Sequence, residues 1–297
     1  MVAFPKKTRE NLYCENPINS GITSVIGADT YIGAHMVKHL REIGKTVYCF
    51  SQKDDFKKTL DNYYVFEGKN PPKPSSPILS DWIVVCIDPI ISFESYSAKI
   101  RNLCKYLYAN KYAGQLVFFS SIDICETDGE PIDEESYVCP CTESDLCLAT
   151  AEHIINVERY KGRNHYFPYV LRVGDVYGDE IGINAPPGIV NGFIREAESV
   201  HNVSCSGMAQ RTFVHVSDAC DSAITIMETG YCPEILILPG EKMTIRKAAE
   251  LVARNYGVPL LDEGLESMND SFACGEPNPK SKYTLEKWLN KKKKAKA

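Results

Sequence analysis

Long apolar runs are missing from this chain. No stretch approaches the roughly 18 consecutive apolar residues that a helix needs to span a bilayer. The N-terminal segment MVAFPKKTRENLYC also lacks the apolar core of a secretory signal. These absences predict an intracellular, cytoplasmic protein with no membrane partner. The formal net charge of −6 argues against nucleic acid as a partner.

Paired cysteine motifs are missing as well. The 297 residues include 12 cysteines, and none of them form a CxxC pair. Cys139-Pro140-Cys141, with Cys147 nearby, is the one cluster, and no histidine completes a zinc set at the usual spacing. Others, such as Cys49 and Cys86, lie inside apolar runs and are typical of small buried hydrophobic residues. The pattern predicts a reducing compartment and no metal site.

What the chain does contain is a regular alternation of short apolar runs and amphipathic stretches. An apolar run of four to eight residues, bounded by turn signals, is typical of a buried parallel strand. We predict strands over residues 22–28, 46–50, 82–87, 115–121 and 168–173. The stretches between them have helical periodicity, and the one that starts with TESDLCLATAEHII is predicted to run from residue 142 to about residue 160. This alternation predicts an α/β fold with a Rossmann-type, doubly wound parallel sheet.

The pattern loosens after about residue 178, which predicts a smaller C-terminal α/β lobe. The expected organisation is an N-terminal extension, a Rossmann-type domain, a smaller lobe whose segments may interleave with the first domain, and a basic tail. These parts correspond to residues 1–21, 22–177, 178–290 and 291–297. The tail, KKKKAKA, is interpreted as a frayed, solubilising end rather than a binding arm.

A glycine-containing turn joins the first predicted strand to the first predicted helix. In that position the start of the helix offers unpaired N–H groups to a pyrophosphate. Gly27 would make the tight turn and Gly33 would allow close packing of helix on strand, whereas Thr30 replaces the middle glycine and places a side chain near the phosphate. The alternative is a turn that merely needs glycine. The candidate cofactor residues of the turn are Gly27, Thr30, Tyr31, Ile32 and Gly33.

The end of the second strand bears on which dinucleotide would bind. An NAD-binding protein usually places an acidic residue there to hold the ribose hydroxyls. This chain has Ser51, Gln52 and Lys53 instead. Lys53 would suit a 2′-phosphate, so Ser51 and Lys53 are candidate cofactor residues, and NADP is favoured over NAD without excluding it.

Five segments together resemble the extended short-chain dehydrogenase/reductase family, in particular its nucleotide-sugar epimerases and dehydratases. The matching segments are VIGADTYIG, VFFSSIDIC, LRVGDVYG, GMAQRTFVHVSDAC and ILPGEKMTIRKAAELVA. The similarity covers roughly residues 22–290. The resemblance implies a Rossmann domain that binds NADP or NAD, a C-terminal lobe that binds a nucleoside diphosphate sugar, and a homodimer to which Ile155 would contribute unless it is a core residue.

The resemblance also implies roles for individual residues of the later segments. Arg211 would contact the phosphate or ribose of the substrate, because a guanidinium suits diphosphate oxygens. The alternative is a surface salt bridge, for example with Asp218, which is otherwise expected to cap a helix beginning near Ala219. His215 is expected to be a packed core residue rather than a catalytic base.

The resemblance has one gap, the family's Tyr-x-x-x-Lys pair, whose lysine lowers the pKa of the tyrosine so that the phenolate can accept a proton. With Glu152 taken as the glutamate that follows the lysine by four residues, Leu148 occupies the lysine position and Ser144 the tyrosine position. Among the 17 tyrosines only Tyr283 has a lysine four residues later, and YTLEK is expected to lie in the C-terminal helix.

Three groups could replace the missing pair. Ser121 lies where the family's helper hydroxyl would polarise a carbonyl, and Asp123 lies close to an acid that sugar dehydratases carry. Cys125 or Cys147 could act as an unusual acid, although no positive charge near them in the sequence would lower a thiol pKa. Each has a structural alternative: a strand-end serine, a solvated carboxylate and buried thiols. Three functions therefore stay open: an enzyme with an altered proton relay that uses Ser121 and Asp123, a non-catalytic ligand-binding subunit, or a scaffold whose cleft binds no ligand.

Overall fold

The computed structural model describes most of the chain, in two compact units. The described residues are 21–52, 62–70, 72, 77–89, 92–126, 129–161, 166–181, 188–205, 207–230, 234–262, 270–274 and 283–296. Unit 1 comprises residues 1–120, 140–171 and 220–236, and unit 2 comprises residues 121–139, 172–219 and 237–297. The two units therefore interleave along the chain. No helix within the described ranges is long and apolar enough to cross a membrane.

Unit 1 is built on a seven-stranded sheet in the order β10-β6-β5-β4-β1-β2-β3. The strands are β1 (Ile22–Ile26), β2 (Thr46–Ser51), β3 (Tyr63–Val65), β4 (Trp82–Val85), β5 (Gln115–Ser121), β6 (Phe167–Val173) and β10 (Ile235–Ile237). The pairings β3–β2, β2–β1, β1–β4 and β4–β5 are all parallel. The predicted fold class is confirmed.

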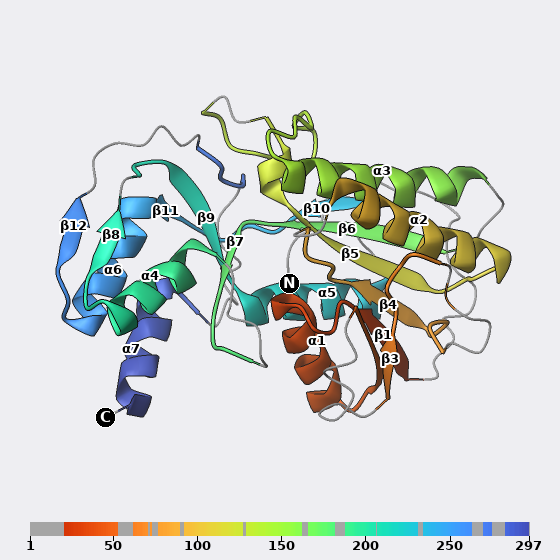
Figure 1. Cartoon of the computed structure of the whole chain (residues 1–297), viewed down its shortest axis with the longest axis horizontal. Helices are drawn as coiled ribbons and strands as arrows, with labels where there is room; N and C mark the ends of the chain where they lie inside the picture. Colours follow the sequence, from red (N-terminus) through yellow and green to blue (C-terminus); the bar gives the residue numbers. More distant parts are fainter. Residues whose placement is uncertain are drawn as a thin grey trace. The chain divides into compact units, whose positions relative to one another are not determined.

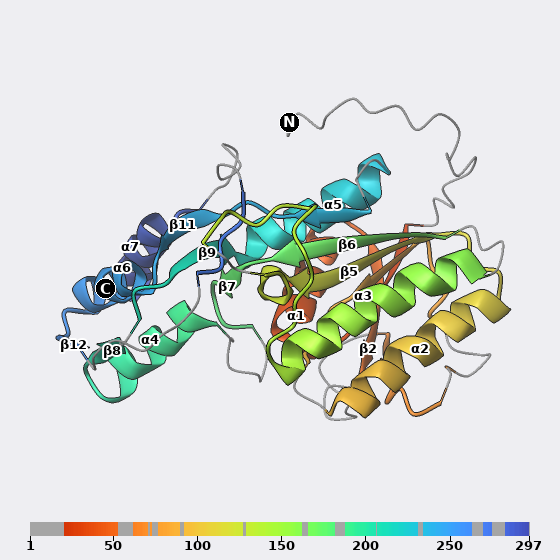
Figure 2. The same cartoon turned by 90° about the horizontal axis from the view of Figure 1, so that it is seen from above.

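Helices cover both faces of this sheet, as a doubly wound fold requires. They are α1 (Tyr31–Glu42), α2 (Phe93–Ala109), α3 (Glu143–Lys161) and α5 (Val216–Thr229). Figure 1 shows α2 and α3 side by side on one face and α1 and α5 on the other, and the second view in Figure 2 agrees. His39 Nδ1 of α1 lies 3.0 Å from Asp221 Oδ1 of α5, which ties the second pair of helices together. Ile155 of α3 is fully buried, so it is a core residue; homodimerisation stays a prediction.

Unit 2 contains two small sheets and three long helices. Its elements are a short 3-10 turn η2 (Ile122–Ile124), β7 (Asp175–Tyr177), α4 (Ile189–Ser199), β8 (Val203–Cys205), β9 (Gln210–His215), β11 (Glu241–Thr244), α6 (Ile245–Tyr256), β12 (Leu260–Asp262) and α7 (Leu285–Lys296). β9 pairs with β7 in parallel and with β11 antiparallel, and β12 pairs with β8. Helices α4, α6 and α7 pack on one apolar core that also receives Tyr177 and Phe213.

Two local expectations were wrong. The basic segment is not a frayed end, because α7 continues through the lysines to Lys296. Asp218 does not cap a helix that begins near Ala219, because α5 begins at Val216 and Asp218 lies in its first turn. The free N–H at the start of α5 is satisfied by a side chain that the sequence did not suggest: Ser217 donates it to Nδ1 of His215, 3.2 Å away.

Candidate functional site

The glycine turn of unit 1 is built by contacts between β1, α1 and the end of β4. Gly27 has φ +86°, and a β-carbon there would overlap the carbonyl oxygen of Cys86. A β-carbon at Gly33 would overlap the carbonyl oxygen of Gly27. The turn therefore requires both glycines for the close packing of α1 on the sheet, as the sequence predicted.

The hydroxyl of Thr30, in the middle of this turn, is hydrogen-bonded within the protein. Its hydroxyl lies 2.8 Å from the carbonyl oxygen of Gly27 and 2.7 Å from that of Cys86, and it accepts the N–H of Gly33 at 3.1 Å. The residue is 8% exposed. The hydroxyl is the N-cap of α1, so it is engaged within the protein, and a contact between Thr30 and a cofactor stays a prediction.

This arrangement makes the Thr30 hydroxyl a larger contributor to stability than an ordinary helix cap. We expect Thr30→Ala to lower the free energy of unfolding by about 2 kcal/mol, because it removes both the cap and the buried hydroxyl that bonds to the carbonyl oxygens of Gly27 and Cys86. Thr244→Ala is the matched control, since Thr244 caps α6 through one bond to the N–H of Lys247. It should cost only about 1 kcal/mol. Equal losses in urea unfolding of the two variants would contradict the extra role of Thr30.

Whether this turn fits a dinucleotide depends on which of its backbone N–H groups are available to bind phosphate. Among the described residues, no partner is found for the backbone N–H of Ile32, the second residue of α1. That N–H and the two glycines form a cradle suited to a pyrophosphate. The Tyr31 side chain is buried, with its ring edge on His35 at 4.9 Å, so its ring faces the core. The residues at the turn fit the pyrophosphate of a dinucleotide.

The ribose end of the candidate cofactor site fits less well. Ser51 is buried, and its hydroxyl is hydrogen-bonded to the hydroxyl of Tyr63 on β3, so its side chain is engaged within the sheet. Lys53 lies outside the described residues.

Buried ionisable groups surround the turn in unit 1, and the sequence did not single them out. Burial first, and the charge of Asp29 second, together raise the pKa of Asp88 to about 6. Burial lowers the pKa of Lys99 on α2 to about 8, and Asp29 opposes that shift. Acidic side chains and one buried lysine therefore lie near the turn.

The two residues that the sequence assigns to the positions of the missing pair lie on the first turns of α3. Ser144 is exposed, and its hydroxyl donates to the carbonyl oxygen of Pro89 at 3.3 Å. Leu148 is buried at 7% exposure. Tyr283 is not in the C-terminal helix, as had been expected, but precedes α7, and its ring stacks on His215 at 3.9 Å. His215 is 4% exposed, which confirms that it is a core residue.

The candidate residues of unit 2 do come together. Arg211 Nη1 donates to Asp123 Oδ1 at 2.6 Å, and Ser271 Oγ donates to the same oxygen at 2.7 Å. Ser121 Oγ donates to Asp123 Oδ2 at 3.1 Å and accepts the Asp123 N–H. The salt-bridge partner of Arg211 is thus Asp123 and not Asp218. We call Ser121, Asp123, Asp175, Arg211 and Ser271 the carboxylate cluster.

Asp175, on β7, belongs to this cluster although sequence reasoning missed it. Burial raises the pKa of Asp175 to about 7; the charge of Asp123 also raises it, while Arg211 and the N–H of Ile189 lower it. Ser271 was missed as well. Asp175 lay in the quoted motif LRVGDVYG, so its carboxylate was the one available signal.

The two candidate cysteines have different surroundings. Cys147 is fully buried, and burial raises its thiol pKa, with Glu143 and Glu94 acting in the same direction. Cys125 is also buried, but the expectation of no nearby cation was wrong, because Arg172 Nη1 lies 3.3 Å from its sulfur. No group of three potential metal ligands occurs among the residues that the structure describes.

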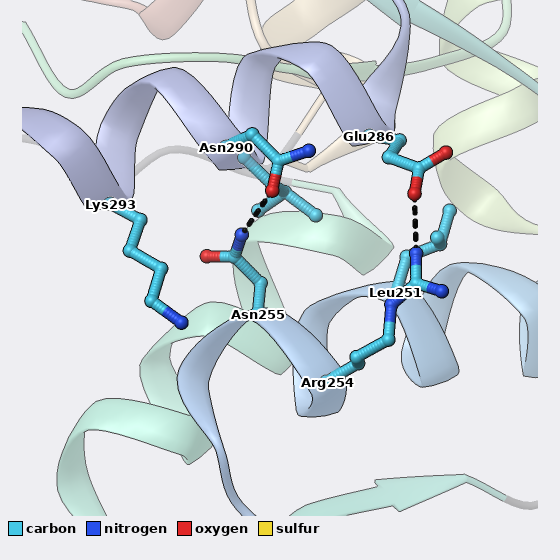
Figure 3. Close-up of a pocket in the computed structure, with 7 residues that line it drawn as sticks. Leu251, Arg254, Asn255, Glu286, Asn290 and Lys293 are labelled. Carbon is cyan, nitrogen blue, oxygen red and sulfur yellow. Dashed lines mark hydrogen bonds and ion pairs between the residues drawn. The ribbon is translucent and has the colours of Figure 1, made fainter.

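Unit 2 also has a pocket of about 210 Å³ between α6 and α7, which Figure 3 shows. It is lined by Leu251, Arg254, Asn255, Glu286, Leu289, Asn290 and Lys293. Its polar groups largely pair with one another: Arg254 with Glu286, and Asn255 with Asn290 at 3.2 Å. None of the residues predicted from the sequence lines it, so we assign the candidate site to the carboxylate cluster and not to this pocket.

Comparison with known proteins supports the α/β fold described above. Residues 87–238, just over half of the chain, match the family described as NAD dependent epimerase/dehydratase. A dTDP-4-dehydro-6-deoxy-D-allose reductase from a Streptomyces species is 28% identical over 94 residues, which are 31% of this chain and 29% of the relative. The same enzyme from Streptomyces bikiniensis is 27% identical over the same shares. The match thus spans less than a third of these relatives.

Solved structures are similar over nearly the whole chain. A NAD-dependent NDP-hexosamine 5,6-dehydratase of tunicamycin biosynthesis has a TM-score of 0.75 at 12% identity, over 92% of this chain and 96% of that one. MoeE5 in complex with UDP-glucose and NAD has a TM-score of 0.74 at 15% identity, over 92% and 97%. The Thermus thermophilus UDP-glucose 4-epimerase complex with NAD has a TM-score of 0.71 at 17% identity, over 91% and 96%. At these identities the likeness shows the fold.

Proposed function

Because the chain belongs to the NAD dependent epimerase/dehydratase family, we propose that it binds NAD at the glycine turn of unit 1 and a nucleoside diphosphate sugar at the carboxylate cluster of unit 2. NAD, when bound, would supply hydride transfer. On this proposal Gly27, Gly33 and the N–H of Ile32 hold its pyrophosphate. The cofactor of the solved MoeE5 complex supports this assignment.

The proposal that the cluster binds a nucleotide sugar is based on the burial and hydrogen bonding of Arg211. Its side chain is 15% exposed, Nη1 is bound to Asp123, and Nε is buried with no hydrogen-bond partner among the residues that the structure describes. A buried N–H without an acceptor is unfavourable, and a phosphate oxygen would satisfy it. The fixed ion pair with Asp123 would hold the guanidinium in place for that contact.

We further propose that proton transfer, where it occurs, uses unit 2 and not the start of α3. Leu148 has no proton to exchange, and a serine hydroxyl such as that of Ser144 does not ionise near neutral pH without a base beside it. Ser121 and the two carboxylates of the cluster provide polar groups within one unit. This reading favours an enzyme with an altered proton relay.

The burial of Leu148 supports the second candidate function, a non-catalytic subunit that still binds ligand. An apolar side chain at this position offers no contact to a cofactor ribose, and loss of a positioned acid–base group costs on the order of 10²- to 10⁴-fold in rate. Incubation of the protein with NAD and UDP-glucose, followed by product analysis, separates the two candidates. Turnover supports the first, and binding without turnover supports the second.

Binding itself is tested by thermal unfolding with NAD, NADP or UDP-glucose. A ligand present at 1,000 times its Kd should stabilise the protein by about 4 kcal/mol. We expect Arg211→Ala to abolish the shift with UDP-glucose and to keep the shift with NAD, each measured against the melting temperature of the variant itself. Arg246→Ala is the matched control, because Arg246 is a more exposed arginine of unit 2 that pairs with Asp262. It should keep both shifts; no shift of the wild-type protein with any of the three ligands would refute the proposal.

A further inference from the structure

The carboxylate cluster contains two carboxylates and one guanidinium, and its two carboxylates differ in their surroundings. Asp123 accepts three hydrogen bonds, from Arg211, Ser271 and Ser121, of which the first is charge-assisted. These bonds use both of its oxygens. Asp123 is therefore tied to Arg211 and to two hydroxyl groups at once.

Asp175 lies on the same face of the small sheet as Arg211. The parallel pairing of β7 with β9 puts Asp175 opposite Phe213, and Arg211 is two residues before Phe213 on β9. Paired residues, and residues two apart on a strand, point to the same side of a sheet. The register therefore brings Asp175 towards the ion pair from a strand distant in sequence.

The start of α4 gives Asp175 one further contact. The backbone N–H of Ile189, the first residue of α4, is hydrogen-bonded to Asp175. Gly188, the N-cap residue, provides no side-chain cap, so the carboxyl of Asp175 acts in its place. This contact favours the ionised form, but burial and the charge of Asp123 outweigh it and raise the pKa of Asp175 to about 7.

Two carboxylates that face one guanidinium leave one excess negative charge, which a single proton neutralises. We propose that Asp175 is the proton-transferring group of unit 2, acting on a hydroxyl or carbonyl oxygen of the bound sugar, while Asp123 holds Arg211 in place. In one direction the Asp175 carboxyl gives its proton to the sugar oxygen and becomes a carboxylate; in the other direction the carboxylate takes a hydroxyl proton. The claim that the sugar exchanges this proton rests on the proposed function. The claim that Asp175 titrates does not depend on it.

Other charged groups on the elements around Asp175 do not account for this behaviour. On β9, the second titratable side chain is that of His215, whose ring is stacked on Tyr283. On α4, the first charged residue after Ile189 is Arg195, more than one turn along the helix. In the segment that carries Ser271, Asp270 accepts the N–H of Gln210 at 2.7 Å. Of these groups, only Asp123 and Arg211 act on the Asp175 carboxyl through their charge.

The test compares melting temperatures of wild type and Asp175→Asn between pH 4 and pH 8.5. The folded-state pKa of Asp175 is above its ordinary value of 3.8, so the folded protein holds a proton that the unfolded chain has lost. The stability that this proton provides is present below pH 4 and is lost as the pH rises towards 7. Asparagine resembles the protonated acid, so the wild type should lose stability relative to the variant from about pH 4 to about pH 7, and the difference should then stay constant.

Two further variants test whether the carboxylate cluster causes this pH-dependent loss of stability. Asp123→Asn removes the charge that opposes ionisation of Asp175 and frees Arg211 to pair with it, so in that background the loss should end at a lower pH. Asp262→Asn is the matched control, because it removes an exposed carboxylate of the same unit. Exposed aspartates are ionised throughout the range from pH 6 to pH 8. Its difference from wild type should be constant between pH 6 and pH 8.

The readouts separate failure of this inference from failure of the proposed function. A constant difference between wild type and Asp175→Asn from pH 5 to pH 8 would overturn the inference, whether or not ligands bind. If Asp175 titrates, a loss of at least 100-fold in turnover of a UDP-sugar by Asp175→Asn supports proton transfer. Unchanged turnover in that variant, or sugar binding without turnover in the wild type, overturns the proposed role of Asp175 in proton transfer. Absence of any shift with NAD or UDP-glucose refutes the proposed function, with the titration still measurable.

Discussion

Gly33→Ala should disrupt the glycine turn more than any other single methyl group added to unit 1. The new β-carbon would overlap the carbonyl oxygen of Gly27, and the hydroxyl of Thr30 would lie 3.0 Å from it. Both atoms are held, since Gly27 accepts the N–H of Thr30 and Thr30 caps the helix. The helix must therefore move away from the strand, and we expect a loss of about 3 kcal/mol in the free energy of unfolding together with loss of the stabilisation by NAD.

A matched glycine is available in a helix of unit 2. Gly192 lies inside α4, and a β-carbon there meets nothing closer than 4.0 Å. Gly192→Ala should therefore stabilise the protein by about 0.5–1 kcal/mol, since alanine is the better helix former. Chemical denaturation of both variants measures the contrast. Equal effects of the two substitutions would show that packing at the turn does not decide the outcome.

The elements of unit 1 were predictable because their signals are local. Each central strand is an apolar run long enough to be buried on both faces, and each helix carries its apolar residues at helical spacing. The glycine turn is likewise contained within seven consecutive residues. Local patterns fail where a nearby side chain takes an unexpected partner, as when Thr30 turns inward and His215 caps α5.

The candidate site of unit 2 could be predicted only in part, because its contacts join residues that are distant in sequence. The Arg211–Asp123 bond spans 88 residues, and the Ser271–Asp123 bond spans 148. Sequence reasoning proposed Asp123 and Arg211 one by one and could not pair them. Asp175 looked ordinary because its pKa depends on burial and on the charge of Asp123, and neither is a property of its own segment.

Trp288→Ala should have the largest effect in unit 2. The indole is 2% exposed, its ring centroid lies 5.3 Å from that of Tyr177, and its N–H donates to Asp179 at 3.3 Å. Truncation of a buried tryptophan to alanine leaves a cavity and costs about 3–5 kcal/mol. We expect that loss in chemical denaturation, with a drop in helical circular dichroism.

The helix that carries Trp288 explains why this one side chain matters so much. Leu285, Trp288 and Leu289 form the buried stripe of α7, whereas the same helix carries six lysines, four of them consecutive. Like charges on neighbouring turns repel one another, so packing and not intrinsic helix stability holds α7 in place. Added salt screens that repulsion, so it should recover part of the stability that Trp288→Ala loses.

Lys287→Ala is the control that separates packing from charge. Lys287 is exposed on the turn of α7 that carries Trp288, and its replacement removes one positive charge without touching the core. Its effect should stay within about 0.5 kcal/mol. If Lys287→Ala stabilised the protein by as much as Trp288→Ala destabilised it, charge rather than burial would govern α7. The stripe at 285, 288 and 289 would then not be what keeps the basic helix on unit 2.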